Sequence, residues 1–190
     1  MMDAARKPRP GTTDMPMQVL LSEEAIRVRV RELAAAIDRD YAGRVPVLIG
    51  VLTGATIFMA DLTRQMGIPL EIEFMAVSSY GAGTESTGVV RILKDLNSEI
   101  TGRDIIVVED IVDSGLTLAY LQSLLRAREP ASLRTCVLLD KKERRETDVA
   151  LDYIGFTIPN AFVVGYGLDY AGLYRQLPFV GVLESSAITQ

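Results

Sequence analysis

The sequence predicts an α/β fold in which a central, mostly parallel sheet is flanked by helices. Nearly continuous apolar runs occur at residues 45–52, 105–108 and 133–139, as in strands that are buried on both faces. Stretches with the apolar spacing of amphipathic helices lie between these runs. Strands that alternate with helices in this way are typical of parallel sheets, because each helix carries the chain back to the start of the next strand.

The N-terminal part predicts a tail and then a helix. Residues 1–16 contain three prolines and no periodic pattern, so we expect a loose tail ahead of one domain at 17–190. An extended piece at 18–21 leads to Ser22, which has the position of a helix N-cap because two glutamates follow it. The helix is indicated by apolar residues that recur on one face, namely Ile26, Val30, Leu33 and Ile37.

The next segment predicts a strand, a tight turn, a helix and a second strand. The run at 45–52 ends in a glycine turn, a helix is indicated at 57–66, and alternating apolar residues predict a strand at 70–76. Residues 78–88 are rich in Gly, Ser and Thr, which is typical of a surface hairpin and equally of a mobile lid. A return strand is expected at 89–93.

The C-terminal half continues the alternation. The strand at 105–108 stops at two adjacent acids, so we expect a compact acidic loop there, followed by a helix that ends near Glu129 and Pro130. The strand at 133–139 leads into a charged loop at 140–146. Shorter strands are expected at 153–158, 162–166 and 180–183.

The composition excludes several kinds of chemistry. The 190 residues contain no histidine and one cysteine, Cys136, which removes Ser-His-Asp and Cys-His catalysis and ordinary zinc sites. The net charge of −5 argues against broad nucleic-acid or membrane-surface binding. The longest uncharged window, 45–60, is too short to span a bilayer, and the N-terminus lacks an apolar signal core, so we expect a cytoplasmic protein.

The segment at 107–117 is the strongest candidate for a functional site. Three acids, Glu109, Asp110 and Asp113, lie between a buried strand and a helix that begins with small and hydroxyl residues. A helix start of this kind accepts phosphate. Acids beside a phosphate indicate sugar hydroxyls, a divalent cation or a proton to be moved. Because ligands of open α/β sheets bind at the carboxyl ends of the strands, we expect residues 53–54, Lys141 and Asp169 to lie nearby.

The segment at 107–117 resembles the phosphoribosyl-pyrophosphate signature of the type I phosphoribosyltransferases. Three further segments resemble the hypoxanthine-guanine branch of that family, in the same order along the chain: Leu52-Thr53-Gly54, Ser79-Tyr80-Gly81, and residues 162–170 with Arg175. The likeness covers about residues 17–185. It implies the type I phosphoribosyltransferase fold, with a small hood and a flexible lid loop over the central sheet.

The resemblance also implies the reaction, in which a 5-phosphoribosyl group moves from phosphoribosyl pyrophosphate to N9 of hypoxanthine or guanine. Asp113 would be the general base or acid at purine N7. Glu109 and Asp110 would meet the ribose hydroxyls, partly through Mg²⁺. The 5′-phosphate would be held at the helix start by Asp113, Ser114, Gly115, Leu116 and Thr117.

The remaining roles that the resemblance implies concern the purine, the pyrophosphate and a second Mg²⁺. Lys141 would donate to the purine O6, which disfavours adenine because an ammonium has no acceptor for an amino group. Phe162 would stack on the base, beside Val163, Leu168 and Asp169, and Asp169 would help to hold the second Mg²⁺. Pyrophosphate would meet Thr53, Gly54, Ser79, Tyr80 and Arg175. The family is typically dimeric or tetrameric, so a homodimer or homotetramer is expected.

The chain departs from the family pattern at two positions. Many relatives carry Lys or Arg in place of Thr53, so pyrophosphate contact there would depend on backbone N–H groups. The family often has a non-proline cis peptide at that step. Leu116 stands where some relatives have a basic or polar residue, which matters less for a loop that binds through its backbone.

Two other functions remain open on the sequence alone. One is a phosphoribosyltransferase for xanthine or another 6-oxopurine. The other is a regulator with this fold that binds nucleotides and RNA, for which the basic cluster at 141–145 is the supporting feature.

Overall fold

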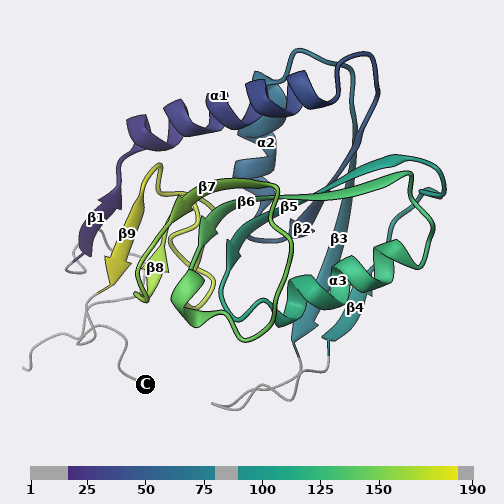
Figure 1. The fold of residues 1–190 in the computed structure, drawn as a ribbon. Coiled ribbons are helices and arrows are strands. Elements are labelled where there is room, and N and C mark those ends of the chain that lie inside the picture. Colours follow the sequence, from purple (N-terminus) through teal and green to yellow (C-terminus); the bar gives the residue numbers. More distant parts are fainter. Residues whose placement is uncertain (1–16, 80–89, 184–190) are drawn as a thin grey trace, which may run out of the picture.

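The computed structural model describes residues 17–79 and 90–183, and its central element is a six-stranded sheet (Figure 1). The four inner pairings between β3, β2, β5, β6 and β7 are all parallel, and β4 pairs with β3 in the antiparallel direction. The predicted mostly parallel sheet is therefore confirmed. In spatial order its strands are β4 (Val90–Lys94), β3 (Glu71–Ser79), β2 (Val47–Leu52), β5 (Asp104–Val112), β6 (Ser132–Asp140) and β7 (Tyr153–Thr157).

Helices cover both faces of this sheet. Helices α1 (Glu23–Asp40) and α2 (Thr56–Gln65) lie on one side, and α3 (Leu116–Arg126) lies on the other (Figure 1). Alternate residues of the strands pack against the two layers. On β5, Ile106 and Val108 join the core under α1 and α2, whereas Ile105 and Val107 join the core under α3. Burial on both faces explains why these strands are apolar throughout.

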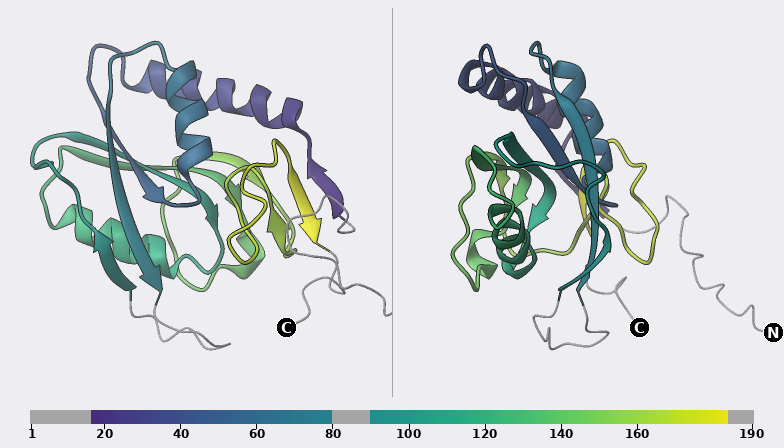
Figure 2. Two further views of the ribbon diagram at one scale, coloured as in Figure 1. Left: turned by 180° about the vertical axis from the view of Figure 1, so that it is seen from behind. Right: turned by 90° about the vertical axis from the view of Figure 1, so that its right-hand side faces the viewer.

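A second, three-stranded antiparallel sheet lies at the side of the molecule away from β4 (Figures 1 and 2). Its strands are β1 (Met17–Leu21), β9 (Val180–Leu183) and β8 (Val163–Val164). The predicted small hood corresponds to this sheet. Residues 1–16 and 80–89, which hold the predicted tail and most of the predicted lid, lie outside the described residues.

Helix α1 matches its prediction in detail. The Ser22 hydroxyl accepts a hydrogen bond from the Ala25 N–H at 3.2 Å, as an N-cap does. The four residues predicted to form its apolar face are all buried. No helix in the described ranges is long and apolar enough to cross a membrane.

The structure corrects several predicted boundaries. Strand β5 continues to Val112, because Ile111 and Val112 pair with Leu139 and Asp140 of β6, so the first two acids are strand residues and not part of a loop. Helix α3 ends at Arg126 and not near Glu129. The charged loop contains a short 3₁₀ helix, η1 (Lys142–Arg144). Strand β8 stops at Val164, because the residues after it have positive φ angles.

The end of α1 is fastened to β6 and β7 by a polar cluster. The Tyr153 hydroxyl donates to Asp40 Oδ2 at 2.7 Å, and Arg134 donates to the same oxygen at 2.5 Å and to the tyrosine hydroxyl at 2.7 Å. The Tyr153 hydrogen bond and then Arg134 hold the pKa of Asp40 below its ordinary value. The cluster joins segments that are far apart in the sequence.

We expect Tyr153→Phe to lower the free energy of unfolding by about 1–2 kcal/mol, because the hydroxyl's two hydrogen bonds, to Asp40 and from Arg134, are lost from a partly buried cluster. Asp40, with its lowered pKa, stabilises the fold above the ordinary aspartate pKa and ceases to do so as pH falls through the lowered value. The difference between wild type and variant should therefore shrink below about pH 4. Urea denaturation at several pH values measures both effects. Tyr120→Phe on the exposed side of α3 is the control, and an equal loss there would contradict the prediction.

Candidate active site

The segments predicted to form the site meet at the carboxyl ends of the parallel strands. All five predicted purine-binding residues line one cavity of about 250 Å³, together with two of the acids. The lining residues are Asp110, Ile111, Asp113, Lys141, Phe162, Val163, Leu168 and Asp169. Ile111 was not predicted, because in the sequence it reads as one more buried strand residue.

A second cavity, of about 130 Å³, lies at the start of α3. It is lined by Glu109, Ile111, Val112, Asp113, Ser114, Gly115, Thr117 and Leu118. Gly115 precedes the helix with a φ of 86°, a left-handed conformation that favours glycine. Leu116 does not line the cavity, although it begins the helix. Asp113 lines both cavities and thus stands between the helix start and the predicted base site.

The two strand acids occupy a water-poor environment. Glu109 is buried, and desolvation together with the neighbouring charge of Asp110 raises its pKa well above the ordinary range. Burial raises the pKa of Asp110 to about 6, against the opposing effect of the Ile111 N–H, which donates to its Oδ1 at 2.8 Å. Two adjacent carboxylates in such a place are costly unless cations or hydrogen-bond donors reach them.

Gly54 allows the turn after β2 to pack directly on Asp110. A Cβ atom at position 54 would lie 1.6 Å from Asp110 Oδ2. On the other side, a Cβ atom at Gly167 would lie 2.1 Å from the Gly54 carbonyl oxygen. The peptide between Leu52 and Thr53 is cis, as the resemblance implied. Three segments are thus stacked without space for a methyl group, and the part played by Gly167 was not predicted.

Asp113 is held by two cations from the segment after β6. Lys141 Nζ lies 3.4 Å from Asp113 Oδ2, and Arg144 Nε donates to Oδ1 at 2.9 Å. Lys141 is buried, which is unusual for a lysine and agrees with its predicted placement in the site. Arg144 was not singled out in the sequence, where it is one of several charges in the segment 140–146.

Phe162 has the exposure of a binding residue. The residue is 41% exposed and lines the larger site cavity, and Tyr170 meets its ring edge-to-face with the centroids 5.7 Å apart. An apolar residue of a strand segment is more often part of the core, and this one is not. Tyr170 supports the ring that would stack on a base, a contact that the sequence did not reveal.

Asp169 and Arg175 form an ion pair at 2.6 Å. The second Asp169 oxygen accepts from the Gly172 N–H at 2.7 Å, and Arg175 also donates to the Gly167 carbonyl. Asp169 therefore caps the turn that follows it. Ser79 is the last residue of β3, and Tyr80 lies outside the described residues.

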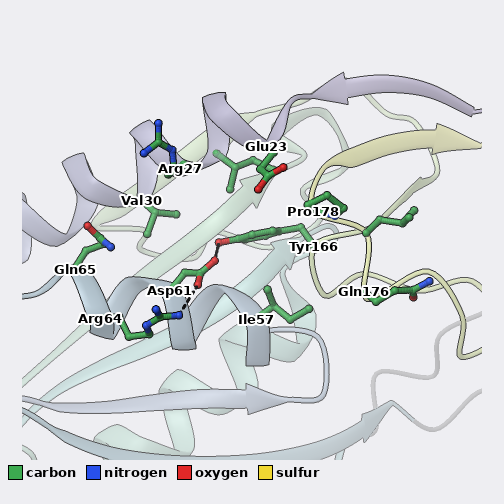
Figure 3. Close-up of a pocket in the computed structure, with 12 residues that line it drawn as sticks. Glu23, Arg27, Val30, Ile57, Asp61, Arg64, Gln65, Tyr166, Gln176 and Pro178 are labelled. Carbon is green, nitrogen blue, oxygen red and sulfur yellow. Dashed lines mark hydrogen bonds and ion pairs between the residues drawn. The ribbon is translucent and has the colours of Figure 1, made fainter.

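A further cavity, of about 350 Å³, lies between α1, α2 and the segment 166–178 (Figure 3). None of the site residues predicted from the sequence lines it. In its wall the Tyr166 hydroxyl donates to Asp61 Oδ2 at 2.7 Å, which ties α2 to the segment that carries Gly167 and Asp169. Its size exceeds that of the other two cavities, but the clustered acids and the helix start lie elsewhere.

Comparison with known proteins identifies the family. A family model described as phosphoribosyl transferase domain matches residues 18–171. The hypoxanthine-guanine phosphoribosyltransferase of Bacillus subtilis is 52% identical over 167 residues, which are 88% of this chain and 93% of that protein. The chain belongs to the hypoxanthine-guanine phosphoribosyltransferase family.

Solved structures agree with this membership. A hypoxanthine phosphoribosyltransferase from Staphylococcus aureus superimposes with a TM-score of 0.89 at 46% identity and covers 93% of this chain and 96% of its own. The chain is also 50% identical to the bifunctional protein TilS/HprT of Listeria monocytogenes, of which it spans about a quarter, 26% of the length. The type I phosphoribosyltransferase fold expected from the sequence is confirmed.

We expect Gly54→Ala to lower the free energy of unfolding by about 1–3 kcal/mol, because the added methyl group forces the turn away from Asp110. Thermal and urea denaturation measure the loss. Gly67→Ala is the matched control, because a Cβ atom there meets only Asp38 Oδ2, at 3.4 Å. Equal stabilities for the two variants would contradict the tight packing at position 54.

Proposed function

We propose that this chain salvages purines by transferring the 5-phosphoribosyl group of phosphoribosyl pyrophosphate to N9 of hypoxanthine or guanine. The products are IMP or GMP and pyrophosphate. The observation that carries the proposal is the position of Asp113, which lines both the base cavity with Lys141 and Phe162 and the cavity at the start of α3. The family membership of the chain supports the same activity.

The base site suits a 6-oxopurine. Lys141 has only donors, so it pairs with a 6-oxo group and opposes the amino group of adenine. Its contact with Asp113 puts a donor and an acceptor side by side, matching the neighbouring O6 and N7 positions of the purine. Phe162 offers its ring face to the base, and Leu168 and the Val163 carbonyl complete the pocket.

The position of the base determines where the ribose and its 5′-phosphate bind. The backbone N–H groups at 113–117, with Ser114, Gly115, Leu116 and Thr117, hold the 5′-phosphate at the positive end of the α3 dipole. The ribose hydroxyls meet Glu109 and Asp110. Because these two carboxyl groups are desolvated, hydroxyl donors stabilise their ionised form.

The reaction exchanges one bond at the ribose C1′ atom. The bond from C1′ to the pyrophosphate oxygen breaks, its electron pair leaves with pyrophosphate, and the purine N9 lone pair forms the new bond to C1′. Asp113 accepts the proton that leaves N7, so the purine does not retain a positive charge. The sugar passes through a state with positive charge near C1′, which the neighbouring carboxylates stabilise.

Mg²⁺ fits the acids that the site contains. The raised pKa values of Glu109 and Asp110 indicate a demand for positive charge, which a divalent cation meets. Among residues 17–79 and 90–183, no group of three or more His, Cys, Asp or Glu side chains is arranged to hold a metal. The carboxylates of Glu109, Asp110 and Asp169 would be the protein's ligands for Mg²⁺, together with oxygens of the substrate. When bound, Mg²⁺ supplies charge neutralisation to the pyrophosphate.

Pyrophosphate is bound by backbone N–H groups and by an arginine. Thr53 and Gly54 present backbone N–H groups, and Arg175 reaches the leaving group by exchanging its ion pair with Asp169 for the phosphates. Ser79 and Tyr80 are the residues that we expect over the pyrophosphate, and Tyr80 lies outside the described residues. Residues 17–190 form one domain in this proposal. The protein assembles into a homodimer or a homotetramer, and light scattering would measure its molecular mass in solution. The buried thiol of Cys136 suits a reducing cytoplasm.

The RNA-binding alternative loses its main support. In the basic cluster, Lys141 and Arg144 are paired with Asp113, and Arg145 is paired with Asp140. Three of the four cations in this cluster would thus have to give up their contacts with carboxylates of this chain in order to bind an RNA phosphate. The xanthine alternative is decided by the choice of base in the assay that follows.

The proposed activity is tested by mixing the protein with Mg²⁺, phosphoribosyl pyrophosphate and each purine base, and measuring released pyrophosphate. We expect release with hypoxanthine or guanine and none with adenine. Release with xanthine alone would favour the alternative substrate. The proposal fails if neither hypoxanthine nor guanine gives any release.

We expect Asp113→Asn to reduce kcat by about 100-fold or more, because the amide cannot accept the N7 proton. The affinity for GMP should change little, since the side chain keeps its shape. Steady-state kinetics and calorimetric GMP titration give the two values. A variant with wild-type kcat would remove the acid–base role of Asp113.

We expect Lys141→Ala to raise the KM for hypoxanthine by about 10-fold to 100-fold, the cost of one hydrogen bond from a charged donor. The KM for phosphoribosyl pyrophosphate should change much less. Lys142→Ala, which alters an exposed side chain of η1, is the control. If the base KM is the same in all three proteins, Lys141 does not read the base.

A further inference from the structure

Asp113 has two cationic partners, and they differ in where they lie. Lys141 lines the base cavity, and its side chain is only 10% exposed. Arg144 is not among the residues that line this cavity, and its side chain is 49% exposed. Lys141 therefore approaches the carboxylate from the ligand side, at 3.4 Å from Oδ2, and Arg144 binds Oδ1 from the solvent side, at 2.9 Å.

The two contacts also differ in strength. A separation of 3.4 Å is long for a hydrogen bond from an ammonium to a carboxylate, whereas 2.9 Å is ordinary for a charge-assisted bond. The hydrogen bond from Arg144 and the charge of Asp113 raise the pKa of the guanidinium above its ordinary value, so Arg144 stays protonated. If Lys141 donates to the purine O6 as proposed, that hydrogen bond would replace its long contact with Asp113.

The backbone holds Arg144 in place relative to Asp113. The carbonyl of Val112, just before the aspartate, accepts from the Lys141 N–H at 3.0 Å. The carbonyl of Ser114, just after it, accepts from the N–H groups of Glu146 at 2.9 Å and Thr147 at 3.3 Å. The segment 141–147 is thus fastened on both sides of Asp113, and Arg144 projects from the middle of it.

This fastening distinguishes Arg144 from an ordinary surface arginine. Its N–H also donates to the Lys141 carbonyl at 2.9 Å, which closes the turn of η1. The acidic groups that act on the Arg144 guanidinium are Asp113 and Glu146. Of these acids, Asp113 alone accepts a hydrogen bond from the Arg144 side chain in the described part of the chain.

We propose that Arg144 is a positioning residue that keeps Asp113 Oδ1 bound throughout the reaction and leaves Oδ2 as the oxygen that accepts the N7 proton. The inference rests on the proposed phosphoribosyl transfer. A hydrogen bond that holds one carboxylate oxygen restricts rotation about the terminal torsion, which keeps the other oxygen directed towards the base. The guanidinium stays protonated at neutral pH and so takes no part in the transfer itself.

The test compares Arg144→Ala, Arg144→Lys and the control Lys142→Ala with the wild-type protein, with Mg²⁺, phosphoribosyl pyrophosphate and hypoxanthine. We expect Arg144→Ala to lower kcat by about tenfold. This is less than the loss expected for Asp113→Asn, because the general base remains and only its orientation is affected. The KM for phosphoribosyl pyrophosphate and the melting temperature should stay near the wild-type values, because an exposed ion pair adds little stability. Arg144→Lys should recover roughly half of the lost kcat, since it restores the charge but not the fixed fork.

Three results would overturn the inference while leaving the proposed function intact. They are a wild-type kcat in Arg144→Ala, a loss that appears only in the KM for phosphoribosyl pyrophosphate, and an equal loss of kcat in Lys142→Ala. A wild-type protein that turns over no 6-oxopurine would instead overturn the proposed function, and this inference with it.

Discussion

The parallel register between β5 and β6 is the constraint on which the site depends. Because Val112 lies opposite Asp140, the first residue beyond each strand falls beside the other, and Lys141 meets Asp113. The same pairing continues the β5 strand through Glu109 and Asp110, so their backbone is held in the extended conformation of the sheet. A shift of the register by two residues would leave every side chain on the same face of the sheet, but it would separate Asp113 from Lys141.

The site concentrates negative charge where water is scarce, and small residues surround it. Asp110 lies against Gly54, and Gly54 lies against Gly167, so backbone approaches closely from two sides. Backbone N–H groups do not titrate and add no side-chain bulk. A region built from glycine and carboxylate can therefore hold a polyanion and its cation without the chain's own side chains filling the space.

Much of the fold could be predicted from the sequence, because the buried strands are apolar on both faces and the helix faces are periodic. The site segments could be predicted because their motif lies between a strand and a helix start. The predicted end of β5 was wrong because strand pairing extends further than the apolar residues do. Glu109 and Asp110 have the side chains of loop residues, but pairing with β6 keeps them in the strand. Arg144, Tyr170 and Gly167 were missed because their partners, Asp113, Phe162 and Gly54, are distant in the sequence, and no local pattern records such a contact.

The hydrogen bond between Tyr166 and Asp61 has a consequence for the length of ligand that the site can bind. It links α2, whose start carries the turn at Gly54, to the segment that carries Leu168 and Asp169. The turn at Gly54 and the segment 166–169 are thus connected to each other by a hydrogen bond between side chains. A site connected in this way is preorganised. A ligand long enough to reach both the turn at Gly54 and the segment 166–169 binds with little loss of conformational freedom in the protein, and a shorter ligand contacts only one of the two.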